Sequence, residues 1–160
     1  MLIKLRKRSA EALRGKAAGE AGFTLVELLV VMLILGLLAA IAIPSFFNQR
    51  DKAKDADAKE SVRTAQTAEE TYATDNNGSY TGSDAAGVLE NIESTLNSAP
   101  NAPVVTVTGG GTGYDVSVTS ATGNVFHIAR DGNGNLTYDC TAAGTAGCPG
   151  SGGGTGSWGQ

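Results

Sequence analysis

One uninterrupted apolar segment limits what this chain of 160 residues can become. The segment from Phe23 to Phe47 contains a single charged side chain, Glu27. The 21 residues from Phe23 to Ile43 would form a helix of about 30 Å, which is the hydrocarbon thickness of a bilayer. We therefore expect one membrane-spanning helix. The averages of 41% hydrophobic and 18% charged residues exclude a multi-pass membrane protein and a coiled-coil rod.

Formal charge is distributed unevenly on the two sides of this segment. The whole chain carries −4, whereas residues 1–22 hold six cations and two carboxylates and so carry +4. The remaining residues therefore carry −8. The positive-inside rule places the basic end in the cytoplasm and the acidic part outside. Because the acidic part lacks a broad basic surface, we predict no direct binding of nucleic acid.

The apolar segment by itself also fits a conventional signal peptide. The stretch Ala40-Ile41-Ala42 supplies a small-x-small cleavage site, which would give a secreted or membrane-anchored binding protein. The apolar run before this site is longer than the ~7–15 residues of a signal peptide. In addition, Glu27 lies inside it, and a carboxylate at the centre of a membrane helix costs about 2.5–3.5 kcal/mol. Glu27 is therefore a candidate functional residue.

A long ordered motif lies where the basic end meets the apolar segment. It reads Gly22-Phe23-Thr24-Leu25-Val26-Glu27 and continues through Gly36 to Pro44 and Ser45. This pattern closely resembles the processing motif of the type IV pilin (prepilin) family, written G|FTLxE. The resemblance is residue by residue from Gly22 to Tyr80 and architectural beyond that point.

The resemblance implies a processing route. A prepilin peptidase would cut between Gly22 and Phe23 and methylate the new amino group of Phe23. Residues 1–22 would be a cleaved leader, longer than that of many pilins that begin with Phe, and residues 23–47 would form a transmembrane and filament-core helix. The resemblance also implies that Glu27 pairs with the Phe23 amine of a neighbouring subunit, because neither charge is well solvated in a membrane. Within one chain, Glu27 could instead reach its own first-turn amides.

Gly36 and Pro44 are poor helix formers within the apolar segment. Glycine costs about 1 kcal/mol and proline about 3 kcal/mol relative to alanine in a helix interior. They predict a kink, or space for close packing against another helix. The resemblance implies further that residues 36–44 lose helicity when the pilus assembles.

Residues 48–75 predict an amphipathic continuation of the same helix. Apolar residues recur at steps of three or four along one face, as in a helix that packs on one side: Ala58, Val62, Ala65, Ala68 and Tyr72. We expect the charges from Arg50 to Arg63 to form a solvated face, some of them bridging subunits. Asn76-Asn77-Gly78 is a helix stop.

Residues 76–103 predict a loop that contains one short helix. Apolar residues from Asp84 to Ile92 have helical spacing, and Ser83 precedes them as a candidate cap. Pro100 and Pro103 are expected to end this segment.

Residues 104–139 predict an antiparallel meander of three or four strands, since the apolar period changes to two and the separators are turn-rich. The expected strands are Val104–Thr108, Tyr114–Thr119, Asn124–Arg130 and Asn135–Asp139. The expected core residues are Tyr114, Val116, Val118, Phe126, Ile128, Leu136 and Tyr138. A helix laid on this sheet gives an α+β fold, in which a long N-terminal helix packs on a small sheet as in type IV pilins.

Residues 140–160 form a glycine-rich tail that contains both cysteines. An even count in an exported domain favours a disulfide between Cys140 and Cys148. The remainder is expected to be a flexible tail or an irregular surface loop. Trp158 is expected to dock the tail onto the sheet, with contact to another subunit or an outside ligand as the alternative.

The other polar motifs give little indication of metal binding or catalysis. The stretch from Asp131 to Asn135 resembles half of a calcium loop, but the twelfth position is Ala142, so a hairpin turn is the expectation. Since related secretion pseudopilins can bind calcium, Asp131 and Asp139 remain weak candidates. His127 has no partner that implies catalysis. We therefore expect no catalytic residue, no metal and no cofactor, and hence no enzyme.

Together these features predict a type IV pilus subunit, for motility, adhesion or DNA uptake. It would be a homo-oligomer in a helical filament, and its partners would be prepilin peptidase and the pilus assembly machinery of the inner membrane. It would cross the cell (inner) membrane once before assembly and be extracellular afterwards. The alternatives are a pseudopilin of a type II secretion system and a secreted binding protein with a conventional signal peptide.

Overall fold

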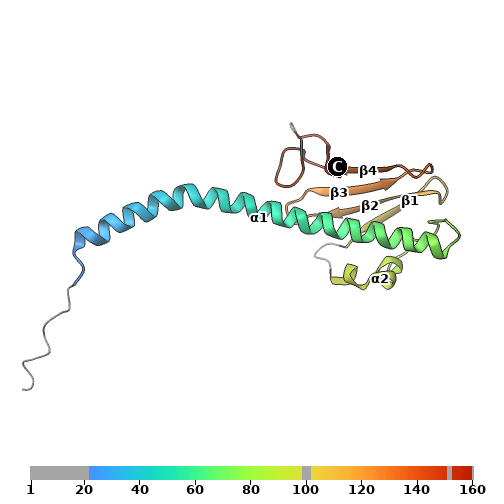
Figure 1. Cartoon of the computed structure of the whole chain (residues 1–160), viewed down its shortest axis with the longest axis horizontal. Coiled ribbons are helices and arrows are strands. Elements are labelled where there is room, and N and C mark those ends of the chain that lie inside the picture. Colours follow the sequence, from blue (N-terminus) through green and yellow to red (C-terminus); the bar gives the residue numbers. More distant parts are fainter. Residues whose placement is uncertain (1–21, 99–101, 151–152, 160) are drawn as a thin grey trace, which may run out of the picture. The chain divides into compact units, whose positions relative to one another are not determined.

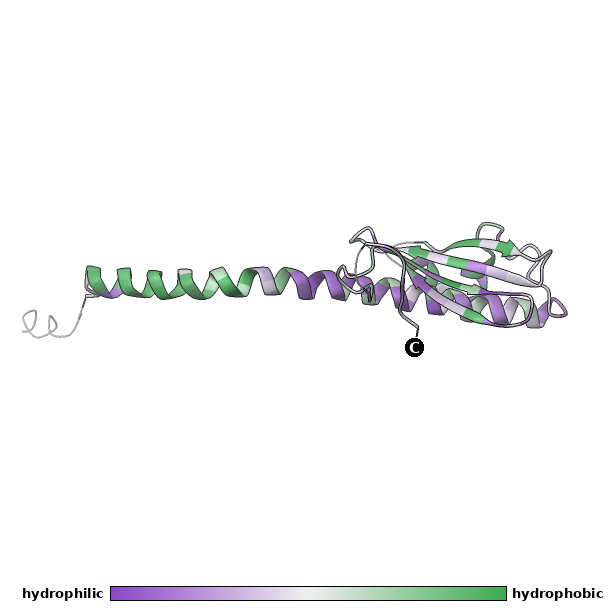
Figure 2. Ribbon diagram, turned by 90° about the horizontal axis from the view of Figure 1, so that it is seen from above, coloured by the Kyte–Doolittle hydropathy of each residue, from purple (hydrophilic) through white to green (hydrophobic). Residues whose placement is uncertain are grey.

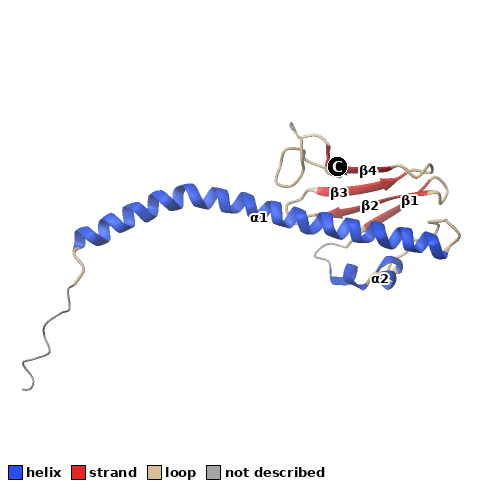
Figure 3. Cartoon of the chain, viewed as in Figure 1, coloured by secondary structure: helices blue, strands red, loops and turns tan. Residues whose placement is uncertain are grey.

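The computed structural model describes residues 22–98, 102–150 and 153–159. The leader expected at 1–22 therefore lies outside the described residues apart from Gly22, and so does Pro100. The elements in chain order are α1 (Leu25–Asp75), α2 (Val88–Ile92), a 3₁₀ helix (Ser94–Ser98), β1 (Val104–Thr108), β2 (Gly113–Thr119), β3 (Val125–Arg130), β4 (Leu136–Cys140) and β5 (Gly156–Ser157) (Figures 1 and 3). The chain divides into two units, one ending at Ile43 and one beginning at Pro44.

The first unit consists of the apolar half of α1. Its large apolar side chains from Phe23 to Ile43 are 44 to 82% exposed, so none of the residues that the structure describes covers them. In Figure 2 the ribbon of this half of the helix has the colour of hydrophobic residues over most of its length. Among the described residues, α1 is the one helix long and apolar enough to cross a membrane. Gly36 and Pro44 both lie within α1, and the loss of helicity expected between them in a filament stays a prediction.

The second unit is a five-stranded antiparallel sheet in the order β1-β2-β3-β4-β5, with the second half of α1 packed on one face. This confirms the predicted α+β arrangement. The inward residues of β2 and β3 are fully buried and pair across the strands: Val116 with Ile128, and Val118 with Phe126. Four of the five strands begin and end within one residue of their predicted bounds. The register therefore places the alternating apolar residues in one core.

Small side chains let α1 approach the sheet closely. Ala58, Val62, Ala65 and Ala68 are all buried, as their spacing predicts. Tyr72 is instead partly exposed, and its hydroxyl donates a hydrogen bond to the carbonyl of Thr81 at 2.8 Å. The helix face thus ends at a polar contact to the following loop.

Two predicted core and helix assignments are wrong. Leu136 is 38% exposed because it pairs with Arg130 at the turn end of the β3–β4 hairpin, beyond the centre of the core. The helix expected from Asp84 begins only at Val88, since Gly87 before it adopts a left-handed φ of 82°. Ser83 therefore does not cap α2, and it lies buried in the preceding turns.

The glycine-rich tail is partly ordered as β5, a fifth strand that the sequence did not predict. It pairs with β4 through Asp139 and Cys140. Trp158 follows it and docks the tail as predicted: the ring is 8% exposed, and its Nε1 donates to the carbonyl of Asp139 at 2.8 Å. The ring packs edge-on against Phe126 and Tyr138, with centroid distances of 5.7 and 5.5 Å. Aromatic and backbone contacts together hold the tail to the sheet.

Asp55 contradicts the expected solvated face between Arg50 and Arg63, because its side chain is fully buried. Its carboxylate accepts hydrogen bonds from the hydroxyls of Ser120 and Thr122, from Asn124 Nδ2 at 2.7 Å and from the Gly147 amide at 2.8 Å. Burial alone would raise the pKa of Asp55, but these hydrogen bonds outweigh it and hold the pKa below its ordinary value. Asp55 therefore fastens α1 to two distant loops as a charged acceptor.

Lys59 departs from the same expectation because it is half-buried, whereas Arg63 is exposed as expected. Lys59 Nζ donates to the Gly147 carbonyl at 2.6 Å. Gly147 is therefore held to α1 through its amide, by Asp55, and through its carbonyl, by Lys59. The ammonium of Lys59 and the guanidinium of Arg63 lie over the Trp158 ring at 5.7 and 5.1 Å from its centroid. These two cations thus cover the docked tail.

Glu69 is a second buried carboxylate, and its surroundings are the opposite of those of Asp55. Neither carboxylate oxygen of Glu69, nor the hydroxyl of Ser83, has a hydrogen-bond partner of standard geometry among the described residues. Burial is the main cause that raises the pKa of Glu69 to about 7; Ser83 opposes the shift, and the charges of Glu70 and Asp84 add to it. The side chain is therefore mainly protonated below about pH 7.

Replacing Asp55 with alanine should destabilise the second unit, which begins at Pro44 and which we call the head, by about 3 kcal/mol, because buried donors lose a charged acceptor. Denaturant unfolding of the mature chain, followed by Trp158 fluorescence, measures this change. Asp57→Ala, at an exposed position two residues along α1, is the matched control and should change stability little. Equal stability of the two variants would contradict the fastening role of Asp55.

Glu69→Gln should flatten the pH dependence of stability. Because the folded state binds the Glu69 proton more tightly, the contribution of Glu69 to the free energy of unfolding is largest below pH 4.5 and is lost as the pH rises through about 7. The variant lacks this loss and should be more stable at pH 8 by roughly 1–3 kcal/mol. Unfolding curves at several pH values test this, with the exposed Glu60→Gln as control. An unchanged slope in Glu69→Gln would refute the assignment.

Candidate functional site

The start of α1 is fixed by a reciprocal pair, Thr24 and Glu27. Glu27 Oε2 accepts hydrogen bonds from the backbone amide and the hydroxyl of Thr24, both at 2.8 Å. The Thr24 hydroxyl in turn accepts from the Glu27 amide at 3.2 Å. This is a capping box, which satisfies two of the free donors at a helix N-terminus. The helix therefore begins at Leu25, two residues after Phe23.

The bond between Gly22 and Phe23 lies just outside this helix. Residues 22–24 are not helical, and both Gly22 and Phe23 are exposed. A peptidase needs an extended, accessible backbone, so this geometry suits cleavage there. Cleavage itself, and methylation of Phe23, remain predictions.

Glu27 keeps a free acceptor next to that bond. Its Oε1 receives no hydrogen bond from any residue that the structure describes, while Oε2 is used within the chain. The contact of Glu27 with the start of its own helix, expected within one chain, is therefore present, and it uses one of the two carboxylate oxygens. The other oxygen is available to a cation from outside, such as an amine at Phe23 of another copy.

The cysteine-bounded loop of the second unit is closed as predicted. Cys140 and Cys148 form a disulfide, with Cα atoms 5.8 Å apart, and both are buried. The loop packs on α1 through Gly147, where an added Cβ would lie 2.6 Å from the Cβ of Asp55. Glycine is thus required for this contact.

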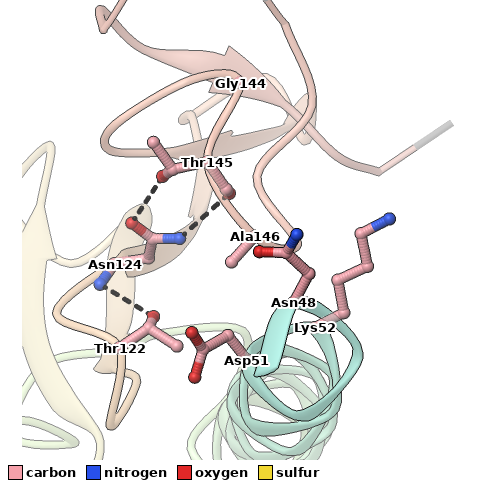
Figure 4. Close-up of a pocket in the computed structure, with 8 residues that line it drawn as sticks. All are labelled: Asn48, Asp51, Lys52, Thr122, Asn124, Gly144, Thr145 and Ala146. Atoms are coloured by element: carbon pink, nitrogen blue, oxygen red, sulfur yellow. Dashed lines mark hydrogen bonds between the residues drawn. The ribbon is translucent and has the colours of Figure 1, made fainter. Parts of the chain in front are cut away.

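A polar cleft of about 510 Å³ opens beside this loop (Figure 4). It is lined by Asn48, Asp51, Lys52, Thr122, Asn124, Gly144, Thr145 and Ala146. Asn124 holds its walls together, since its side chain bonds both the hydroxyl and the carbonyl of Thr145. The cleft therefore joins α1, the β2–β3 turn and the disulfide loop.

The calcium candidates lie at separate places. Asp131 closes the β3–β4 turn as a hairpin, and its carboxylate accepts from the amides of Asn133 and Asn135 and from the Asn135 side chain. Asp139 lies near the other end of β4, opposite His127. The part of the chain that the structure describes brings no three metal-ligating side chains together. His127 bonds Asp115 on the sheet, with Nδ1 3.1 Å from Oδ1.

Sequence reasoning missed two contributors to these sites. The cap formed by Thr24 was visible as the T-x-x-E spacing before an apolar run. The role of Asp55 had no local signal, because its partners lie 65 to 92 residues away along the chain.

Known proteins are similar to this chain mainly at its N-terminus. Residues 18–43 match the family described as "Prokaryotic N-terminal methylation motif". The type IV major pilin protein PilA of Myxococcus xanthus is 43% identical over 51 residues, which is 32% of this chain and 23% of that protein. The type II secretion system core protein G of Pseudomonas aeruginosa is 40% identical over 57 residues, 36% of this chain and 40% of that protein. The chain thus spans less than half the length of these two relatives.

Another relative is matched over most of its length. The competence protein ComGC of Halalkalibacterium halodurans is 32% identical over 94 residues, which is 57% of this chain and 87% of that protein. No solved structure matches the chain. The prepilin motif, the uncovered apolar helix and these relatives agree, and the chain belongs to the type IV pilin family.

Proposed function

We propose that this chain is the structural subunit of a type IV pilus, polymerised through the first half of α1. The main support is the apolar half of α1, which no part of the described chain covers. Its N-terminus is capped by Thr24 together with the Glu27 carboxylate. In water such a surface must be covered, either by lipid or by the same helix of other copies of the chain. A filament subunit is covered first by lipid and then by its neighbours in the filament.

The proposed route begins in the inner membrane. The chain inserts with its basic residues 1–22 in the cytoplasm, and a prepilin peptidase cuts between Gly22 and Phe23. The same enzyme methylates the new amine of Phe23. The assembly machinery then moves the mature chain, with its formal side-chain charge of −8, into an extracellular filament.

Lipid and filament offer the apolar helix similar surroundings, so the transfer changes little hydrophobic energy. The Glu27 carboxylate favours transfer into the filament, because an unpaired charge in lipid is costly and the filament would offer it a partner. The free Oε1 of Glu27 would accept the Phe23 amine of the preceding subunit. This pairing would select correctly positioned subunits and set their register.

The head supplies the outer surface of the filament, and we assign it no catalytic role. Motility, adhesion and DNA uptake are all compatible with it. The similarity to core protein G favours one alternative, a pseudopilin of a type II secretion system. Deleting the chain separates the two: a pilus subunit is needed for surface filaments, and a pseudopilin for protein export.

The mature N-terminus tests the processing step. Intact mass and N-terminal sequencing of the chain from cell membranes should give a start at Phe23 with one additional methyl group. Gly22→Val should block the cut, because the side chain occupies the position before the scissile bond, and precursor should accumulate. A mature chain beginning at Ile43, as after a conventional signal peptide, would contradict the proposal.

Glu27→Gln tests the assembly step. The variant should still be cut after Gly22, but surface filaments counted by electron microscopy should fall at least about tenfold, as expected if about 1.4 kcal/mol or more of pairing is lost. The control is Glu60→Gln, an exposed carboxylate on the other half of α1. Normal filament numbers with Glu27→Gln would show that the carboxylate plays no part in assembly.

A further inference from the structure

The cations of the predicted mature chain are concentrated in one short segment. We call residues 48–54 the neck. It holds Arg50, Lys52 and Lys54, which are three of the six cations after residue 22. With Asp51 as the one carboxylate, the neck carries a formal +2, whereas the mature chain as a whole carries −8. The neck is therefore the basic segment of an acidic protein.

The neck follows directly on the end of the apolar segment. Phe46 and Phe47 are 67 and 53% exposed, and Asn48 is the next residue of α1. Seven helical residues rise about 10 Å. The headgroup layer on one side of a bilayer is about 5–8 Å thick. The 25 residues from Phe23 to Phe47 are about 37 Å long, so the helix fits the hydrocarbon layer of about 30 Å when it is tilted. A tilted helix that spans the membrane up to Phe47 places the neck among lipid headgroups.

The polar cleft opens at this neck. Figure 4 shows Asn48 and Asp51 of α1 facing the disulfide loop and the β2–β3 turn, while the Lys52 side chain extends outwards at the edge of the cleft. Its volume of about 510 Å³ is within the range of about 300–1,000 Å³ for small-molecule sites. The cleft is thus large enough to admit a headgroup.

Most polar groups of the cleft wall are already engaged. Thr122 and Asn124 donate to Asp55, and Thr145 donates to Asn124 and to the Ala142 carbonyl. These bonds make the wall rigid without adding free charge.

The charged groups of the neck that form no ion pair are cationic. Lys54 Nζ pairs with Asp51 at 3.0 Å, which neutralises the one carboxylate of the neck. Lys52 and Arg50 form no ion pair with any residue that the structure describes, and both are exposed. Lys52 and the Asn48 amide therefore remain at the cleft to bind an anion, whereas Arg50, two residues before Lys52, lies on the opposite side of α1.

We propose that the neck and its cleft bind the phosphate of a membrane phospholipid in the outer leaflet of the inner membrane. Lys52 contacts the phosphate, and the Asn48 amide donates to its oxygens or to the adjoining glycerol esters. Arg50, on the opposite side of α1, contacts the phosphate of a second headgroup. The site rests on the membrane-spanning role of α1 proposed above. It holds the waiting subunit at a fixed depth, and the contact is released on extraction into the filament.

The test uses the mature full-length chain. Flotation with phosphatidylglycerol vesicles first establishes insertion. Amide resonances of Asn48, Thr145 and Ala146 are then followed in neutral detergent micelles while phosphatidylglycerol is added. Saturable shifts are expected in the wild type. Arg50→Gln with Lys52→Gln should raise the midpoint by about fivefold for each cation removed, while Arg63→Gln, at an exposed position further along α1, should leave it unchanged.

Three results would overturn the site. Equal midpoints for the double variant and the wild type would mean that lipid contacts the apolar helix alone. Equal shifts with inorganic phosphate, or with an uncharged glycolipid, would remove the assignment to a phospholipid. A wild-type chain that floats but shows no shifts would refute this site alone, whereas failure to float would also refute the membrane-spanning role.

Discussion

Uncovered apolar surface on the first half of α1 is the constraint on which the rest of the chain depends. Its large apolar side chains are exposed in the described part of the chain, so they need another cover wherever the chain resides. Lipid supplies that cover first, and in the proposed filament the same helices of other subunits replace it. Since the two environments are similarly apolar, the polar groups at the two ends of the apolar segment decide whether the chain stays in the lipid or enters the filament. Glu27 stands at one end, and the neck with Arg50 and Lys52 stands at the other.

The head meets a different requirement, which is to stay folded while it is displayed. Its core is small, and much of the helix face is alanine, so specific polar contacts and the disulfide add to the packing. Asp55 ties α1 to the loops through four donors, and Trp158 closes the sheet edge beneath two cations. Glu69 works against stability at high pH, because its buried carboxyl lacks partners of standard geometry.

Local patterns predicted most of the architecture. Alternating apolar residues located four strands, helical spacing located the buried alanine face, and two cysteines sufficed for the disulfide. What they missed depends on contacts distant in sequence. Asp55 looked like one more surface charge, because its donors lie beyond residue 119. The strand β5 is built from Gly156 and Ser157, which have little strand preference and are ordered by pairing with β4. Ser83 had the spacing of a cap, but the left-handed backbone of Gly87 starts the helix later.

Electron cryomicroscopy of surface filaments would test whether this chain assembles through the first half of α1. We expect filaments made of this chain, beginning at Phe23, with the first half of α1 buried in the core. We also expect the carboxylate of Glu27 within hydrogen-bonding distance of a neighbouring subunit's Phe23 amine. Filaments that lack this chain, or that carry the first half of α1 on their surface, would contradict this mode of assembly.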